Sequence, residues 1–164
     1  DEIEAARTMT RHLIERGHRR IALITGPLDT PGGRLRLEGF REELGDRFDP
    51  ELVETGSYEA ASGDAAMTAL LERAPDIDAV FAASDVMAVG AIEALRRAGR
   101  RVPEDVAVVG FDDVADAADY RPPLTTLRTP QDVTNSAADR VSGCGVRVIL
   151  RSTCPSVAGI PGPR

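Results

Sequence analysis

The chain has 164 residues, 42% of them hydrophobic and 29% charged, with a formal net charge of −7 at pH 7 and no tryptophan. This length suits one domain with an aliphatic core, and the acidic balance argues against direct binding of nucleic acid, which needs a clustered basic surface. No stretch approaches the roughly 20 apolar residues that span a bilayer, and the start DEIEAARTM lacks the basic and apolar segments of a signal peptide, so we expect a cytoplasmic chain without membrane contact.

Helical and strand patterns alternate along the first half of the chain. Apolar residues at helical spacing predict a helix over 2–16, which Gly17 ends. The almost wholly apolar run over 21–26 predicts a strand that is covered on both faces. A Pro/Gly-rich loop then leads to a predicted helix over 34–44, and a second strand is predicted over 52–58.

The second half continues the alternation. Its predicted elements are helix 62–74, strand 77–84, helix 86–98, strand 106–112 and an extended segment over 124–129. Strands and helices that alternate at this spacing are typical of a parallel sheet. The sequence therefore predicts an α/β fold in which helices flank a parallel sheet on both faces.

The pattern changes near the end of the chain. We expect a main unit over 1–129, an atypical region over 130–151 in which VRVIL is predicted as a strand, and a poorly ordered Gly/Pro/Ser-rich tail over 152–164. Cys144 and Cys154 both lie in this part. Two cysteines are a poor disulfide framework for a domain of this size, so we expect free thiols in a reducing compartment.

Polar side chains follow the predicted strands. Right-handed crossovers bring the carboxyl ends of all the strands to one edge of the sheet, and open sheets bind ligands at that edge. The candidate site residues there are Arg34, Tyr58, Ser84, Asp85, Asp112 and Asp113. Carboxylates accept hydrogen bonds from sugar hydroxyls, arginine donates them, and an aromatic ring stacks on a sugar's apolar face. The set therefore predicts a small-molecule site for a sugar or related polyol.

Each candidate also has a structural interpretation. Arg34 is either a solvated arginine near a helix start or a ligand contact, and its place after a Gly-rich strand-to-helix loop favours contact. Asp85 suits the N-cap of the next helix better than ligand contact, and Tyr58 is open between surface packing and ring stacking. Asp112 and Asp113 have no histidine nearby in sequence and no third ligand, so we expect neither a metal site nor a cofactor.

Three longer strings occur in a distinctive order: GHRRIALITGPLDTPGGRLRLEGFREEL, SDVMAVGAIEALRRAGRRVPEDVAVVGFDD and YRPPLTTLRTP. Together they resemble successive signatures of the lactose-repressor/galactose-repressor family of bacterial transcription regulators. The strings lie within residues 17–130, and the resemblance spans roughly residues 6–133. The resemblance implies a fold like that of periplasmic sugar-binding proteins, with essentially one of the usual two subdomains in this chain. It also implies that the helix-turn-helix domain and the hinge are absent from the chain.

The resemblance further implies which residues contact the effector. The positions that match the family's effector-binding motifs are Arg34, Tyr58, Ser84, Asp85 and Asp112. Thr129 stands where the family usually has glutamine.

The function implied is that of an effector-sensing and dimerising domain of a transcription regulator. DNA binding is expected only through a helix-turn-helix domain outside this chain, and the expected homodimer contact is the exposed face of helix 86–98 with the segment after Asp113. A solute-binding protein of a sugar transporter has the same architecture and is the alternative. An enzyme is not expected, because the sequence has no P-loop and no G-x-G-x-x-G, G-x-S-x-G or H-E-x-x-H motif.

Overall fold

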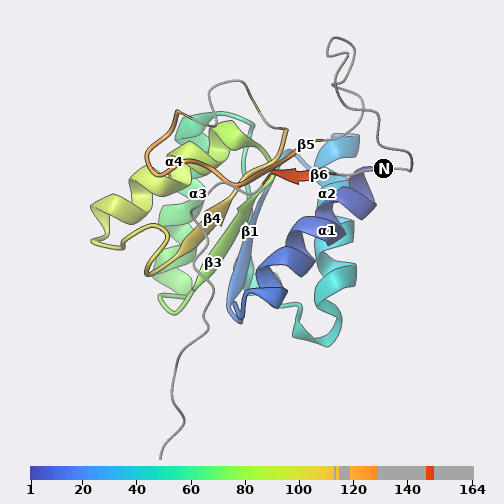
Figure 1. The fold of residues 1–164 in the computed structure, drawn as a ribbon, viewed down its shortest axis with the longest axis horizontal. Coiled ribbons are helices and arrows are strands. Elements are labelled where there is room, and N and C mark those ends of the chain that lie inside the picture. The colour runs from blue at the N-terminus through green and yellow to red at the C-terminus, as the bar shows by residue number, and fades with distance from the viewer. Residues whose placement is uncertain (113, 115–118, 129–146, 150–164) are drawn as a thin grey trace, which may run out of the picture.

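The computed structural model describes residues 1–112, 114, 119–128 and 147–149 (Figure 1). In chain order its elements are α1 (Glu2–Glu15), β1 (Ile21–Thr25), α2 (Pro31–Leu44), two short 3-10 helices (Gly45–Arg47 and Pro50–Leu52), β2 (Val53–Thr55), α3 (Ala60–Arg73), β3 (Ala79–Ala82), α4 (Asp85–Arg97), β4 (Ala107–Val109), β5 (Thr126–Arg128) and β6 (Arg147–Ile149).

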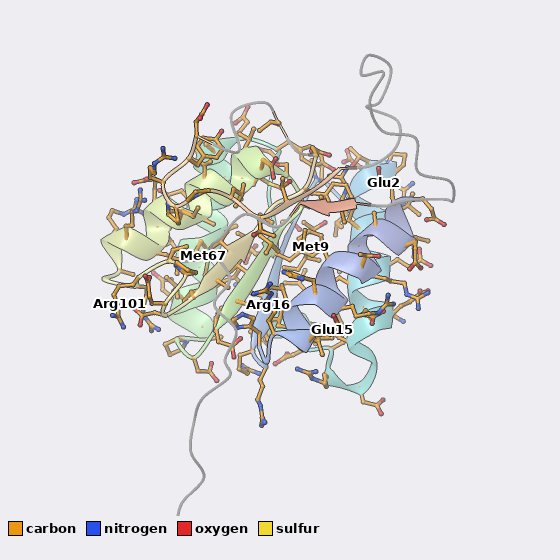
Figure 2. The ribbon with its side chains drawn as sticks, in the orientation of Figure 1. Glu2, Met9, Glu15, Arg16, Met67 and Arg101 are labelled. Atoms are coloured by element: carbon orange, nitrogen blue, oxygen red, sulfur yellow. The ribbon has the colours of Figure 1, made fainter. Side chains whose placement is uncertain are left out.

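Strands β1 to β4 form one parallel sheet in the order β2-β1-β3-β4. Helices α1 and α2 cover one face of this sheet, and α3 and α4 cover the other (Figure 1). Figure 2 shows the two layers through two buried methionines, Met9 on the α1–α2 side and Met67 on the α3–α4 side. The predicted α/β class, a parallel sheet with helices on both faces, is confirmed.

The strands are apolar throughout because both of their faces are covered. Successive side chains of a strand point to opposite faces, so Leu23 and Phe81 pack under α1 and α2, while Ile24 and Val80 pack under α3 and α4. Every residue of β1, β3 and β4 is buried. This arrangement explains why the sequence shows continuous apolar runs here instead of alternation.

Polar side chains set the starts of the helices. Asp1 caps α1 and Thr30 caps α2, each accepting a hydrogen bond from a backbone amide of the first turn. The cap of α4 is Ser84, whose hydroxyl accepts from the amide of Met87 at 3.2 Å. The prediction that Asp85 is this N-cap is therefore wrong by one residue, because Asp85 is already the first helical residue and its side chain is used elsewhere.

Several predicted bounds shift in the structure. Helix α2 begins at Pro31, three residues before the predicted start, because proline is accommodated in a first helical turn. The second strand is shorter than predicted, since Pro50–Leu52 forms a 3-10 helix before it. Strand β6 confirms the strand predicted within VRVIL, and it pairs antiparallel with β5.

Glycines allow the two helices on each face to approach closely. A Cβ built on Gly90 of α4 would lie 1.9 Å from the carbonyl oxygen of Ala60, and one on Gly63 of α3 would lie 2.1 Å from that of Met87. On the other face, a Cβ on Gly39 would lie 2.3 Å from the carbonyl oxygen of a residue in the first turn of α1. The backbones of each pair are therefore too close together for any side chain between them.

Several predictions concern residues outside those described. They are the acid Asp113, the substituted Thr129, the cysteines Cys144 and Cys154, the tail over 152–164 and, apart from 147–149, the region over 130–151. Within the described part of the chain, no helix has the length and apolar character needed to cross a membrane.

Candidate effector site

Between the carboxyl ends of β1 and β3 lies the point at which the strand order of the sheet reverses, since the chain continues from β1 to β2 on one side and from β3 to β4 on the other. After β1 the chain enters α2 on one face, and after β3 it enters α4 on the other. In sheets of this kind, ligands bind in the crevice between two such strands. Hydrogen bonds hold the segments that follow the strands together, since the amide of Ala83 donates to Ile24 at 2.8 Å and that of Asp85 to Phe111 at 2.9 Å.

Arg36, which is not among the predicted site residues, is the arginine that reaches this edge. Its side chain is 10% exposed. One Nη2 proton is directed to Oδ1 of Asp112 at 3.2 Å, and Nε donates to Oε2 of Glu2 at 2.6 Å. Nη1 donates to the carbonyl of Ala83. The guanidinium carbon lies 3.8 Å from the ring centroid of Phe111, which is a cation–π contact.

Helical periodicity separates Arg36 from Arg34. The buried positions of α2 repeat at intervals of three and four residues: Gly33, Arg36, Gly39, Phe40 and Leu44. Arg34 lies off this stripe and is exposed, and its Nη1 is 3.3 Å from the carbonyl oxygen of Leu28. The buried stripe was therefore the signal in the sequence that pointed to Arg36, and the contact predicted for Arg34 stays a prediction.

The charge of Arg36 is maintained by its neighbours. Burial alone lowers the pKa of Arg36, because it disfavours the charged form. The hydrogen bond to Glu2 and the negative charges of Asp112 and Glu2 outweigh burial, so the pKa of Arg36 is raised above its ordinary value. The guanidinium is a permanent cation and a hydrogen-bond donor at this edge.

Two of the predicted residues, Tyr58 and Asp112, share an unusual backbone conformation. Among the described residues other than glycine, these two have a positive φ, 65° for Tyr58 and 95° for Asp112. The amide of Asp112 donates to the carbonyl of Leu127 at 3.0 Å, and its side chain is 43% exposed. Such conformations cost energy in residues with a side chain and concentrate at functional sites. This conformation is an observation about Tyr58 and Asp112 that is independent of their side-chain chemistry, and their contact with an effector stays a prediction.

The ring of Tyr58 lies over the glycines that follow β1. A Cβ on Gly26 would be 2.1 Å from Cζ of Tyr58, and one on Gly32 would be 3.2 Å from its hydroxyl. The ring also packs against the α3–α4 core. Packing is thus one role of Tyr58, and stacking on an effector stays a prediction.

Ser84 and Asp85 are both buried, and the contacts described for them are structural. Ser84 caps α4 as described above. Asp85 is 0% exposed, and its Oδ1 accepts from the hydroxyl of Thr126 at 2.6 Å while Oδ2 accepts from the amide of Val114 at 2.9 Å. Asp85 therefore ties α4 to the segment after β4 and to β5. Effector contact by either residue stays a prediction.

The side chains that the structure brings together at this edge are Arg36 and Asp112, with Glu2 behind Arg36. A guanidinium donates hydrogen bonds and a carboxylate accepts them, which is the pair of functions that a sugar hydroxyl requires. Among the described residues, no three histidine, cysteine or acidic side chains lie close enough to hold a metal ion. Surface pockets lined by described residues lie away from this edge, one beside His18 and one between α3 and α4.

An open parallel sheet with helices on both faces, and with a paired arginine and aspartate at its carboxyl edge, is the arrangement of a ligand-binding domain of the α/β class. The chain belongs to the periplasmic binding protein-like domain family, whose sequence model matches residues 10–141.

Two curated relatives are transcription regulators. The HTH-type transcriptional regulator CelR of Thermobifida fusca is 49% identical over 151 residues, which are 87% of this chain and 44% of that protein. The ribose operon repressor of Escherichia coli strain K12 is 45% identical over 126 residues, which are 75% of this chain and 38% of that protein. The chain thus spans less than half the length of these relatives.

Solved structures agree with these relatives. The transcriptional regulator CelR in complex with cellobiose is 53% identical, with a TM-score of 0.77 over 79% of this chain and 41% of that chain. A sugar-binding transcriptional regulator of the LacI family from Escherichia coli, in complex with phosphate, is 30% identical, with a TM-score of 0.83 over 95% and 62% of the two chains. The predicted resemblance to lactose-repressor/galactose-repressor regulators is confirmed, and these matches do not favour the transporter alternative.

Proposed function

We propose that this chain is the effector-sensing unit of a bacterial transcription regulator and that its effector is a neutral sugar or related polyol. The observation that carries the proposal is the pairing of Arg36 with Asp112 at the carboxyl edge of the sheet, 3.2 Å apart. The relatives support the regulator role, and the cellobiose complex of CelR makes a disaccharide the first effector to test.

The geometry favours a particular division of work within the site. Asp112, at 43% exposure, accepts hydrogen bonds from effector hydroxyls, while Arg36 donates from its ring-stacked position. Tyr58 offers an aromatic face beside the β1 end. Arg34 is an outer contact from the exposed side of α2, and Ser84 and Asp85 hold the base of the crevice.

The partners follow from the same role. We propose a homodimer through the exposed face of α4, where Val86 is a large apolar side chain with 38% exposure. DNA is bound through a helix-turn-helix domain that these described residues do not include, and the regulator acts in the cytoplasm without catalysing a reaction. Light scattering on a size-exclusion column tests the dimer, and a monomer at high protein concentration contradicts it.

Thermal unfolding of the chain with and without cellobiose, ribose and other neutral sugars tests the effector site. A ligand that binds only the folded state raises the unfolding temperature by mass action. At least one sugar is expected to raise the unfolding temperature. Asp112→Asn is expected to weaken the binding of that sugar by about tenfold or more, because a hydrogen bond to a charged group is lost. A cooperatively unfolding chain that responds to none of these sugars contradicts the proposal.

Two arginine variants separate the predicted contact from the observed one. Arg36→Lys keeps the positive charge and removes the planar set of guanidinium donors. It is therefore expected to weaken the binding of the sugar more than Arg34→Ala does. Arg41→Lys, on the exposed face of the same helix, is the matched control and is expected to leave affinity unchanged. A larger loss in Arg34→Ala than in Arg36→Lys would place the contact at Arg34 instead.

A further inference from the structure

Glu2, in the first turn of α1, is a second carboxylate on the guanidinium of Arg36. Its Oε2 lies 2.6 Å from Nε of Arg36, closer than Asp112 Oδ1 lies to Nη2 at 3.2 Å. Figure 2 shows Glu2 at the amino end of α1, on the side of the molecule where β5 and β6 lie. Glu2 therefore reaches the candidate site from an element that no effector motif includes.

The contacts of Arg36 determine which of its protons are available to an effector. A guanidinium has five N–H donors in one plane. Glu2 accepts from Nε, the carbonyl of Ala83 accepts from Nη1, and Asp112 accepts from Nη2. Within the described part of the chain, one proton on Nη1 and one on Nη2 remain without an acceptor. Stacking on the Phe111 ring fixes the plane, and Glu2 fixes the rotation within it.

The position of Glu2 is itself well determined. Asp1 caps α1 through Oδ1, which accepts from the amides of Ile3 and Glu4 at 2.9 and 3.4 Å. Directly across from this turn, Gly39 of α2 leaves room only for backbone, since a Cβ there would lie 2.3 Å from the carbonyl oxygen of Ile3. The first turn of α1 thus packs against α2 one helical turn from Arg36. The backbone of this turn has no room to shift toward α2, so the Glu2 carboxylate starts from a fixed point.

The balance of charge at the site also depends on Glu2. Arg36 contributes one positive charge, and Glu2 and Asp112 contribute two negative charges within 3.2 Å of it. An anionic ligand that approaches the two remaining protons therefore meets a group of three charged residues whose net charge is negative. A neutral hydroxyl compound meets no such repulsion.

We infer that Glu2 is a positioning and specificity-determining residue of the effector site: it orients the guanidinium of Arg36 and makes the site select neutral over anionic ligands. The inference rests on the proposed function for the identity of the effector. Its two physical consequences, a fixed Nε–H and rejection of anions, are measurable without any sugar.

Proton exchange of Arg36 tests the positioning role. The Nε–H signal of Arg36 is assigned by its loss in Arg36→Lys, and its exchange with solvent is measured by NMR. We expect slow exchange in the unaltered chain and an acceleration of about tenfold or more in Glu2→Ala, because the acceptor is removed. Glu4→Ala removes an exposed carboxylate from the same turn and is expected to leave the rate unchanged. Rapid exchange in the unaltered chain, or equal rates in the two variants, overturns the positioning role.

Titration with inorganic phosphate tests the selection by charge. Glu2→Gln and Glu4→Gln each remove one negative charge from the first turn of α1, so they match in net charge. We expect Glu2→Gln to bind phosphate about tenfold more tightly than Glu4→Gln, the effect of one unit charge several ångströms away at an intermediate dielectric. Adding Arg36→Met to Glu2→Gln removes the cation that would hold the phosphate, so it is expected to abolish the gain. Equal phosphate affinities in Glu2→Gln and Glu4→Gln overturn the inference.

Titration with cellobiose separates this inference from the proposed function. We expect Glu2→Ala to weaken cellobiose about tenfold relative to Glu4→Ala, since a misaligned donor pair loses one charged hydrogen bond. Unchanged affinity in Glu2→Ala overturns the inference while leaving the proposed function intact. Absence of cellobiose binding in the unaltered chain counts against the proposed function for that sugar, and the exchange and phosphate results then decide the role of Glu2.

Discussion

Gly90→Ala in α4 has two opposite effects on the stability of the protein, one through helix propensity and one through packing. Alanine is favoured over glycine in a helix interior by about 1 kcal/mol, so intrinsic propensity predicts a more stable protein. The structure predicts the opposite, because the new Cβ would lie 1.9 Å from the carbonyl oxygen of Ala60 and 2.8 Å from its carbonyl carbon. The obstacle is backbone of α3, which cannot swing aside as a flexible side chain can.

Relief of this overlap requires α3 and α4 to move apart. A normal carbon–oxygen contact is about 3.5 Å, so the helices must separate by more than an ångström or the methyl must be accommodated by bending. Overpacking of this kind costs about 1–3 kcal/mol, and here the cost falls at the upper end because Gly63 and Met87 share the same close approach. After the gain in propensity is subtracted, we expect a net loss of about 2 kcal/mol.

Urea denaturation measures this loss. With a slope of about 2 kcal/mol per molar urea, the midpoint of unfolding is expected to fall by about 1 M. Thr68→Ala, at an exposed position of α3, is the control and is expected to change stability by less than about 0.5 kcal/mol. A midpoint for Gly90→Ala equal to or above that of the unaltered chain would show that the helices tolerate the methyl and would refute the close-packing argument.

Three further changes have expected outcomes in the same unfolding assay. Asp85→Asn keeps the volume of a fully buried side chain, but its amide nitrogen faces either the amide of Val114 or the hydroxyl of Thr126, both of which donate to Asp85. We expect the free energy of unfolding to fall by about 1–3 kcal/mol. An unchanged midpoint contradicts this. The pKa of both His12 and His18 is lowered below 6.5, chiefly by burial. The unfolded chain therefore takes up protons first as the pH decreases, and the free energy of unfolding falls below about pH 6.5. Replacing both histidines by glutamine should flatten this dependence of stability on pH. The hydrogen bond from Arg11 chiefly lowers the pKa of Glu43, so Glu43→Gln should cost about 1 kcal/mol at neutral pH and progressively less as acid protonates Glu43 below pH 4.5; a pH-independent cost would refute the role of its charge.

Periodicity along the chain was enough to predict the layers of this fold. Apolar runs with no alternation, such as IALIT in β1, occur where helices cover both faces of a strand, so the pattern itself reports a sheet inside two layers. Local chemistry predicted the helix ends less well, because Ser84 and Asp85 are adjacent residues that can each serve as an N-cap. The choice between them depends on Thr126 and the amide of Val114, which give the Asp85 carboxylate another use.

The sequence by itself also predicted the edge at which a ligand would bind, because parallel strands with right-handed crossovers all end on the same side. It placed Asp112 and Tyr58 after strands that end there, and both have a positive φ in the structure, while their contact with an effector stays a prediction. Spacing from Phe40 and Leu44 favoured position 36 for the buried face of α2, but only the tertiary structure decided that its guanidinium reaches Phe111 and two carboxylates. Arg34 and Arg36 have the same chemistry and differ by two residues, or about 200° around a helix. Packing of α2 on β1 and α1 turns Arg34 outward and Arg36 onto Phe111. The two carboxylates on Arg36 belong to Glu2 and Asp112, which are separated from it by 34 and 76 positions in the sequence, so no local pattern encodes these contacts.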